Sequence, residues 1–182
     1  AYSYGFDSSP DDMLGRVSAV TLPDEALTAA AYTYLGANTV VTRSMPKPGL
    51  TMDMTGFTGD AGDTVGGLDR FGRVESMPWN VGGTGIDLFQ YGYTPSSFRR
   101  FRKNAAGPTG QDEAYGHDLL QQVTSREKGT LNVSGSGIAG IPAETEQFDY
   151  DPAGNWLQYI REEAGAVTVD QTLSLIHISE PT

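Results

Sequence analysis

Few side chains in this sequence could perform acid–base or nucleophilic chemistry, and they are poorly grouped. Before residue 173, His117 is the only histidine, and the chain has no cysteine. A Ser-His-Asp triad would have to use His117, which stands beside Asp118 in an expected turn, where a histidine is more commonly a solvated residue. Thiolate chemistry and cysteine-based zinc sites are excluded. We therefore assign no catalytic residue.

Two pairs of carboxylates are candidates for a catalytic or a metal site. Asp149 and Asp151 flank Tyr150 and would share one face of a strand, as an acid–base pair for glycoside hydrolysis requires. Asp151, however, is needed by a turn. Asp60 and Asp63 resemble half of a calcium loop but lack the bidentate glutamate that completes one. We expect no metal ion and no cofactor. A glycoside-active enzyme is the least favoured interpretation, behind the two given at the end of this section.

Charge argues against a polyanionic partner. The stretch from Arg99 to Lys103 places Phe101 among basic residues, a pattern also found in grooves that bind single-stranded nucleic acid. The whole chain nevertheless carries a formal net charge of −11, which repels nucleic acids and anionic membranes. We favour a solvated strand face on which arginine stems pack against aromatic rings. No apolar run is long enough to span a bilayer, so we expect no nucleic-acid partner and no membrane insertion.

The elements that must position these residues are predicted to be hairpins. The pattern Asp-x-x-Gly followed by Arg or Asn occurs three times. Aspartate suits the first position of a type I turn, and glycine supplies the left-handed conformation of a bulge before the return strand. We predict a positive φ at each of these glycines. The turn residues are Asp12, Gly15 and Arg16; Asp69, Gly72 and Arg73; and Asp151, Gly154 and Asn155.

Three weaker copies extend the pattern. In residues 34–40 Asn38 replaces the glycine, in residues 91–99 Thr94 replaces the aspartate, and in residues 115–123 Gln121 replaces the glycine. Successive turns lie roughly 25 to 35 residues apart, which is typical of structural repeats. The 23 glycines and the scarcity of helical periodicity favour an all-β chain. A short helix at 24–31 is expected to lose to a strand, and residues 55–67, 104–112 and 134–142 are expected to be loops.

Aromatic pairs at strand spacing precede several turns. Side chains two residues apart on a strand share a face. We expect them to stack across neighbouring hairpins as an aromatic ladder, with a sugar-binding surface as the alternative. The ladder residues are Tyr32, Tyr34, Tyr91, Tyr93, Phe148 and Tyr150.

The motif resembles that of the RHS/YD-repeat proteins, whose hallmark is Tyr-Asp-x-x-Gly-Asn/Arg followed by Leu or Val. Residues 148–156 match it almost throughout, residues 68–74 match except that Leu68 replaces the tyrosine, and residues 12–17 match from the aspartate onward. The resemblance implies repeated antiparallel hairpins that form part of a curved or spiralling β-sheet shell. Such shells enclose a cargo polypeptide in bacterial toxin complexes, and in animal teneurins they belong to an adhesive ectodomain.

The resemblance also implies a function. The chain would be a structural repeat segment of a large bacterial protein, secreted or at the cell surface. Its partners would be the remainder of its own chain and an enclosed toxin or cargo. The alternative is a carbohydrate-binding or adhesive module that contacts cell-surface glycans.

Two regions are expected. Residues 1–172 form the RHS/YD-repeat β-region, interpreted as a fragment of a longer protein because the chain starts at Ala1 without Met. Residues 173–182, Leu-Ser-Leu-Ile-His-Ile-Ser-Glu-Pro-Thr, match the in-frame translation of a sequencing-library adapter. We interpret this tail as non-native and exclude it from the assignment of fold and function.

Overall fold

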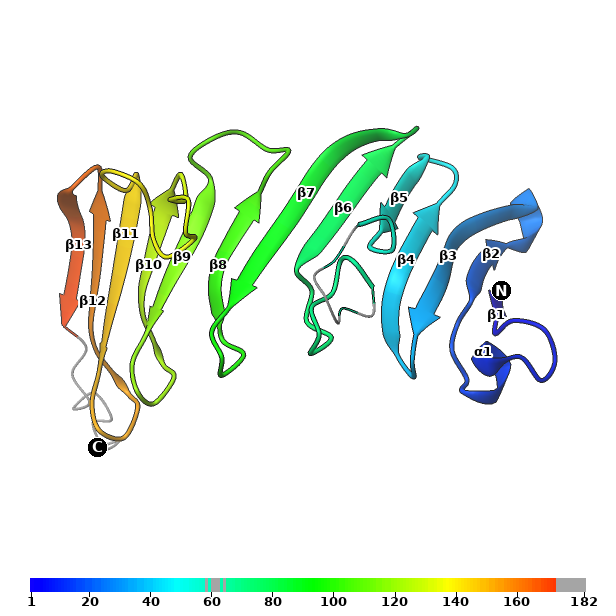
Figure 1. Cartoon of the computed structure of the whole chain (residues 1–182), viewed down its shortest axis with the longest axis horizontal. Coiled ribbons are helices and arrows are strands. Elements are labelled where there is room, and N and C mark those ends of the chain that lie inside the picture. Colours follow the sequence, from blue (N-terminus) through cyan, green and yellow to red (C-terminus); the bar gives the residue numbers. More distant parts are fainter. Residues whose placement is uncertain (58, 60–62, 64, 173–182) are drawn as a thin grey trace, which may run out of the picture. The chain divides into compact units, whose positions relative to one another are not determined.

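The chain folds into an antiparallel sheet of consecutive hairpins. The structure, a computed structural model, describes residues 1–57, 59, 63 and 65–172. Within these residues thirteen strands follow one another in the sheet in the order of the sequence, and the sheet is not closed into a barrel (Figure 1). The predicted all-β class is confirmed. The curvature of the expected shell stays a prediction.

The strands are short to medium in length, and helical structure in the described residues is confined to two brief turns. The helical turns are α1 (Pro10–Met13) and the 3-10 turn η1 (Pro23–Glu25). The strands are β1 (Tyr2–Ser3), β2 (Ala19–Leu22), β3 (Leu27–Leu35), β4 (Thr39–Met45), β5 (Leu50–Asp53), β6 (Ser76–Val81), β7 (Thr84–Tyr93), β8 (Arg99–Asn104), β9 (Asp112–His117), β10 (Val123–Gly129), β11 (Glu144–Tyr150), β12 (Trp156–Glu163) and β13 (Ala166–Thr172).

The repeated turns share one hydrogen-bond pattern, beginning at Asp69, Thr94, Asp118 and Asp151. The N–H of each first residue donates to the carbonyl four residues later at 2.8–3.0 Å, and its own carbonyl accepts the N–H three residues later at 2.9–3.1 Å. The residue in that third position has a φ between 67° and 84° in all four turns. The repeat is therefore a backbone conformation, and it tolerates a change of side chain.

The side chain of the first residue completes each turn. The Oδ1 atoms of Asp69, Asp118 and Asp151 each accept two backbone N–H groups, two and four residues ahead, at 2.8–2.9 Å. The Thr94 hydroxyl oxygen accepts the Phe98 N–H at 3.1 Å. These bonds satisfy backbone donors that the turn leaves without a strand partner.

The predicted positive φ is confirmed at Gly15, Gly72 and Gly154, with values of 63°, 75° and 84°. Gln121, at 67°, also occupies the left-handed position predicted for it. In residues 34–40 the prediction was wrong, because Gly36 takes that conformation, at 61°, in place of Asn38. Glycine has no Cβ to oppose a positive φ, so it takes the position when both residues are available.

The first copy of the motif is not a hairpin, contrary to expectation. Asp12 lies in α1, which Ser9 caps by accepting the Asp12 N–H at 3.2 Å, and Gly15 follows the end of this helical turn. Pro10 occupies the first helical position, where proline is favoured. The copy thus lies within the long connection between β1 and β2, where the local sequence favours a helical turn over a tight β-turn.

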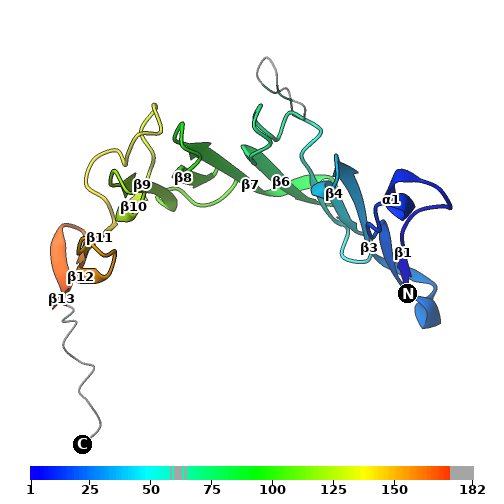
Figure 2. The same cartoon turned by 90° about the horizontal axis from the view of Figure 1, so that it is seen from below.

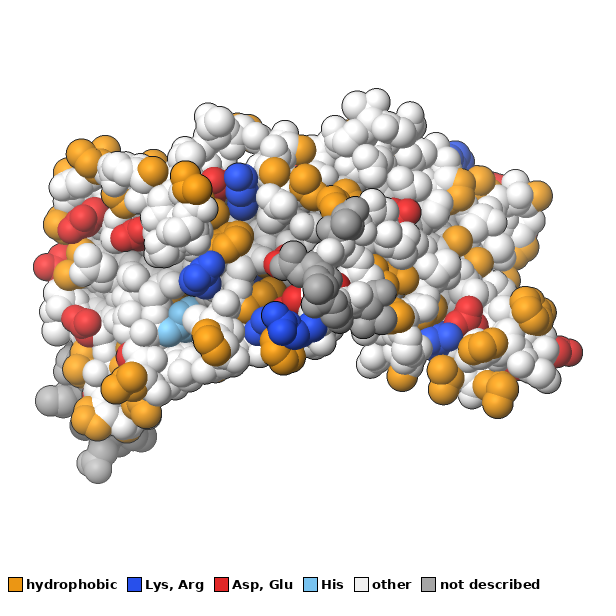
Figure 3. Space-filling view, in the orientation of Figure 1, with side chains coloured by type: hydrophobic (Ala, Val, Ile, Leu, Met, Phe, Trp, Pro, Cys, Tyr) orange, Lys and Arg blue, Asp and Glu red, His pale blue; other side chains and the backbone are white. Residues whose placement is uncertain are grey.

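The described residues group into two units, Ala1–Gln90 with Ala105–Gly107 and Tyr91–Asn104 with Pro108–Thr182. The first unit holds an apolar cluster of Val41, Met52, Met54 and Leu68. The connection between β5 and β6 brings Leu68 onto this cluster, where the side chain is fully buried. Hydrophobic side chains also gather at the surface near α1 (Figure 3), where Phe6, Met13 and Leu14 are exposed.

The alanine-rich stretch at 24–31 forms no α-helix, as expected. The turn η1 covers Pro23–Glu25, and Ala26 ends it with a left-handed φ of 50°. Strand β3 begins at Leu27 and pairs with β2 and β4. Sheet pairing on both sides outweighs the helix propensity of the alanines, which is only a few tenths of a kcal/mol per residue.

In the second unit the connection between β10 and β11, which Figure 2 shows rising from the strands, lies over one face of β8 to β10. The Leu131 N–H donates to the Asp112 carboxylate at 3.1 Å, and Gly135 lies against the Phe101 ring, so close that a Cβ there would approach it to 2.8 Å. Since Asp112 and Phe101 lie on neighbouring strands, this connection acts as a lid over what we call the loop face of the unit.

Candidate functional site: an ionic network on strands β8 to β12

The opposite face of the second unit, which we call the network face, carries charged residues in two adjacent rows across the strands. In one row Tyr115, Arg126, Glu146 and Arg161 stand directly opposite one another on β9 to β12. In the other row the register partners are Arg102, Glu113, Lys128, Glu144 and Glu163. Residues two apart on a strand point to the same side, so both rows share this face.

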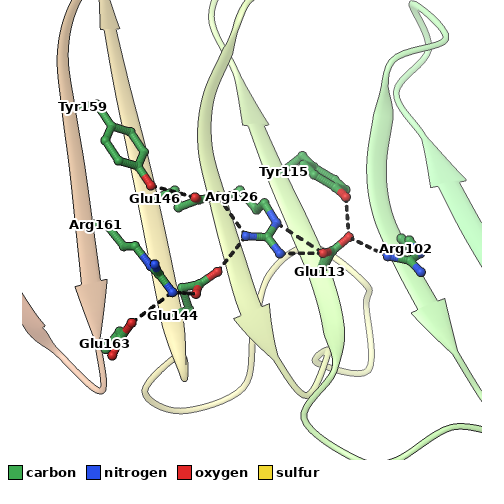
Figure 4. A network of polar contacts seen from close by, with 9 residues as sticks. All are labelled: Arg102, Glu113, Tyr115, Arg126, Glu144, Glu146, Tyr159, Arg161 and Glu163. Atoms are coloured by element: carbon green, nitrogen blue, oxygen red, sulfur yellow. Dashed lines mark hydrogen bonds and ion pairs between the residues drawn. The ribbon is translucent and has the colours of Figure 1, made fainter. Parts of the chain in front are cut away.

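Arg126 is the centre of the network (Figure 4). Its Nη2 lies 2.7 Å from Glu113 Oε1, and its Nη1 lies 2.7 Å from Glu144 Oε1 and 2.8 Å from Glu146 Oε2. One guanidinium therefore joins carboxylates from β9 and β11 on the two sides of β10. A planar group with five donors suits this role better than a lysine ammonium does.

Two further arginines extend the network to the neighbouring strands. Arg161 Nη2 lies 2.5 Å from Glu144 Oε2 and 2.9 Å from Glu163 Oε1. At the other end Arg102 Nη1 lies 3.3 Å from Glu113 Oε2. The network thus runs without interruption from β8 to β12.

Two tyrosines donate hydrogen bonds to glutamate oxygens that Arg126 does not reach. The Tyr115 hydroxyl donates to Glu113 Oε2 at 2.5 Å, and the Tyr159 hydroxyl donates to Glu146 Oε1 at 2.8 Å. Because each of these carboxylates also accepts from Arg126, neither has an oxygen without a donor.

Two of the network carboxylates, Glu113 and Glu144, are held in their charged form. Burial alone would raise the pKa of Glu113, but hydrogen bonds from Tyr115 and Arg126 hold it below its ordinary value. Burial also opposes the lowered pKa of Glu144, which hydrogen bonds from Arg161 and Arg126 produce. Burial and the neighbouring Glu113 raise the pKa of Tyr115.

This arrangement suits cross-strand stabilisation and not proton transfer. A general acid or base needs a pKa near the working pH and access to a substrate. Here the carboxylate of Glu113 is paired with Arg126 and accepts a hydrogen bond from Tyr115, and the residue is only 8% exposed. Satisfied ion pairs of this kind are costly to disrupt one partner at a time.

The turn residues named from the sequence act locally. Arg73 Nε pairs with Asp69 Oδ2 at 2.6 Å, and the Asn155 side-chain amide donates to Asp151 Oδ2 at 2.9 Å. These contacts explain the preference for Arg or Asn after the glycine. In the first copy Arg16 pairs with Asp11 and not with Asp12.

These contacts lower the pKa of two turn aspartates, Asp69 and Asp151. The side-chain amide and N–H of Asn155 lower the pKa of Asp151. Burial opposes the lowered pKa of Asp69, which follows from its bonds to Arg73 and Phe71. Both carboxylates are therefore committed to their turns.

The aromatic residues expected to form a ladder make two kinds of contact, and stacking across neighbouring hairpins stays a prediction. Phe148 contacts Trp156 and Tyr159 across the hairpin, with ring centroids 5.3 and 5.4 Å apart. The rings of Tyr32, Tyr34 and Tyr91 instead carry guanidinium groups, from Arg43 at 5.8 Å, Arg16 at 4.8 Å and Arg99 at 4.9 Å. Cation–π contacts thus occupy positions where we expected ring stacking.

The other sequence candidates are not assembled into a catalytic site. Asp149 lies on β11 opposite Gln158, whereas Asp151 is bonded within its turn. His117 ends β9 and contacts the Phe98 ring at 5.6 Å. The half calcium loop falls partly outside the described residues, and in the described part no cluster of three acidic or histidine side chains could hold a metal ion.

The basic stretch on β8 packs against aromatics as expected, but its side chains do not alternate strictly between the two faces of the sheet. Arg99 covers Tyr91 and bonds to Tyr115, on the network face. Arg100 stacks on Phe101 and donates to the Ser134 carbonyl of the lid at 3.4 Å. Since Arg102 also reaches the network face, the strict two-residue period fails at the start of this strand.

The network itself was missed because its members come from five strands. Only the register brings them together, and register depends on turn lengths that single residues do not reveal. A usable signal does exist, namely charged or tyrosine side chains two residues apart on successive predicted strands. The pairs are Glu113 and Tyr115, Arg126 and Lys128, Glu144 and Glu146, and Arg161 and Glu163.

Comparison with known proteins gives similarity in fold. The sequence matches no family profile and no curated protein sequence. The chain is similar to the crystal structure of TcdB2-TccC3-TEV, with a TM-score of 0.58 and 14% identity over 84% of this chain. It is also similar to the Tc holotoxin pore of Photorhabdus luminescens with a mutated TccC3, with a TM-score of 0.60 and 13% identity over 86% of this chain. The chain spans 8% of each matched chain.

Proposed function

We propose that this chain is a segment of the wall of a large RHS-type shell protein. The observation that carries the proposal is the repeated turn, in which Asp69, Thr94, Asp118 and Asp151 begin the same set of backbone bonds. Sheets built by stacking one supersecondary unit grow in one direction without needing a closed core. The similarity in fold to Tc toxin components supports the same assignment.

A wall one sheet thick must satisfy both of its faces without a second sheet. In the second unit the lid covers the loop face through Leu131 and Gly135. The network face is satisfied by its own ion pairs around Arg126. Over β8 to β10 this division reduces the apolar face that a half-covered sheet would present.

The partners of such a segment would be the rest of its own chain and an enclosed polypeptide cargo, such as a toxin domain. The parent protein would be bacterial and either secreted or held at the cell surface. No helix among the described residues is long and apolar enough to cross a membrane.

No reaction is proposed for this segment. The carboxylate pair that the sequence offered for hydrolysis, Asp149 and Asp151, is split between a strand and a turn. A panel of glycoside and ester substrates should give no turnover with the purified chain. Turnover that disappears in Asp149→Asn would replace this assignment with that of a hydrolase.

An adhesive or carbohydrate-binding module is the second candidate. Trp156 is 48% exposed and packs against Phe148, and Phe148 packs against Tyr159. Partly exposed aromatic rings can bind the apolar faces of sugars. Binding to a glycan array that is lost in Trp156→Ala but kept in Trp79→Phe would favour this role.

Recovery of the flanking DNA tests the shell assignment. A shell protein requires many further copies of the turn, spaced like those described here, on at least one side of this segment. An open reading frame that encodes no further Asp-x-x-Gly turns would contradict the proposal.

A further inference from the structure

The geometry of the network face points to an acid-sensitive clasp: we propose that protonation of the glutamates around Arg126 releases strands β9 to β12 while the rest of the fold persists. This inference concerns the sheet alone and does not depend on the shell assignment. It rests on the placement of four carboxylates and four basic side chains in two adjacent rows.

The clasp adds cross-strand ion pairs to strands that also share backbone bonds and the ring contacts of Phe148. Arg126 on β10 binds Glu113 on β9 and Glu144 on β11, and Arg161 on β12 binds the second oxygen of Glu144. Glu144 therefore lies between two guanidinium groups. Its charge is the one whose loss affects both cations at once.

The charges that face one another are balanced only when the glutamates are ionised. Strand β8 contributes Arg102, with Arg99 bonded to Tyr115, and β13 places Val169 and Ala166, which carry no charge, opposite the rows. The acidic members are Glu113, Glu144, Glu146 and Glu163, and the basic members are Arg102, Arg126, Lys128 and Arg161. Protonation of the acids would leave four cations on neighbouring positions of one face, which repel one another.

The direction of the pH effect follows from linkage. Glu113 and Glu144 have folded-state pKa values below the ordinary 4.5. Their contribution to stability is therefore complete above the unfolded-state value and is lost as the pH falls through the lower folded-state value. The clasp should be closed at neutral pH and should open below about pH 4.5.

The first unit supplies an internal reference. Strands β3 and β4 carry no aspartate or glutamate. Their opening should depend on pH much less than that of β10 and β11. A comparison within one sample cancels the effect of pH on the intrinsic exchange rate of backbone amides.

Hydrogen exchange of the full chain from pH 7 to about pH 3, which extends well below the ordinary glutamate pKa, tests the proposal. The ratio of protection in β10 and β11 to protection in β3 and β4 should start to fall below about pH 4.5 and should be lower by about fivefold or more at the acidic end. A ratio that stays constant over this range would overturn the clasp.

Single substitutions sharpen the test. In Glu144→Gln the ratio should already be lower at pH 7 and should fall less than in the wild type on acidification, because only Glu113 of the two linked carboxylates remains. The matched control is Glu25→Gln, which removes an exposed pair with Lys47 outside the clasp, where the Glu25 side chain is 54% exposed, and should keep the wild-type pH profile. If Glu144→Gln keeps the wild-type profile as well, the proposal is wrong. If Glu144→Gln fails to fold, the wild-type pH series alone still decides.

Discussion

The hydroxyl of Tyr150, at the end of β11, donates a hydrogen bond of 2.8 Å to the backbone carbonyl of Val123 at the start of β10. Tyr34, at the end of β3, makes the same bond of 2.8 Å to the carbonyl of Val17. In both cases the tyrosine precedes one turn and the valine follows the motif before it. At these two positions the pre-turn tyrosine therefore fastens its hairpin to the segment that follows the preceding motif.

The same contact persists where the side chain has changed. His117 precedes the Asp118 turn and packs on Phe98, which follows the Thr94 turn. The position thus couples neighbouring repeats through a hydrogen bond or through ring packing. This coupling explains why an aromatic residue precedes the turn in the repeat motif.

Tyr150→Phe should lower the free energy of unfolding by about 0.5–1.5 kcal/mol, because it removes one hydrogen bond and leaves the ring in place. Urea denaturation of the variant and the wild type measures this difference. Tyr2→Phe is the control, since Tyr2 is 68% exposed and should show no effect. Equal stability of the two variants would show that the bond to Val123 contributes nothing.

Gly72→Val should destabilise the fold by about 1–3 kcal/mol through backbone strain alone. Gly72 has a φ of 75°, and a Cβ there would meet no atom within 4 Å. Gly72→Asn should cost clearly less, because asparagine tolerates the left-handed region. Thermal unfolding distinguishes the two variants. A valine variant as stable as the asparagine variant would contradict the turn geometry.

Arg126→Met should lower the free energy of unfolding by about 2 kcal/mol or more, because it leaves three partly buried carboxylates without their shared cation. Lys47→Met removes an exposed pair with Glu25, whose side chains are 70% and 54% exposed, and should cost less than about 1 kcal/mol. Urea denaturation at neutral pH compares the two. Similar losses for both variants would place the network among ordinary surface ion pairs.

Deletion of residues 173–182 should leave the melting temperature unchanged, because this segment matches an adapter translation. Differential scanning calorimetry of the chain with and without these residues provides the measurement. A drop of several degrees on deletion would show that the segment contributes to the fold.

The sequence predicted the local features well, since each depends on a few adjacent residues. The aspartate at position 151, the glycine three residues later and the asparagine after it form one turn whose bonds close within five residues. Strand β3, which was expected to outweigh a short helix at 24–31, was also predictable from Tyr32 and Tyr34. These features need no knowledge of the rest of the sheet.

The network could not be predicted in the same way. Glu113 and Arg126 meet because the turn at Asp118 sets the register of β9 and β10, and a bulge near Val123 shifts that register. A slip of one residue would send every side chain of a strand to the opposite face. The hairpin predicted at the first copy of the motif is absent for a different, local reason. Ser9 and Pro10 favour a helical turn there.

The most direct test of the shell assignment is a cryo-electron microscopy map of the complete protein that contains this segment. The account predicts a hollow particle in which residues 1–172 form part of a wall one sheet thick, with the four repeated turns along one edge of the sheet. A map in which the network face of β8 to β12 packs against a second sheet or a helical layer would contradict it.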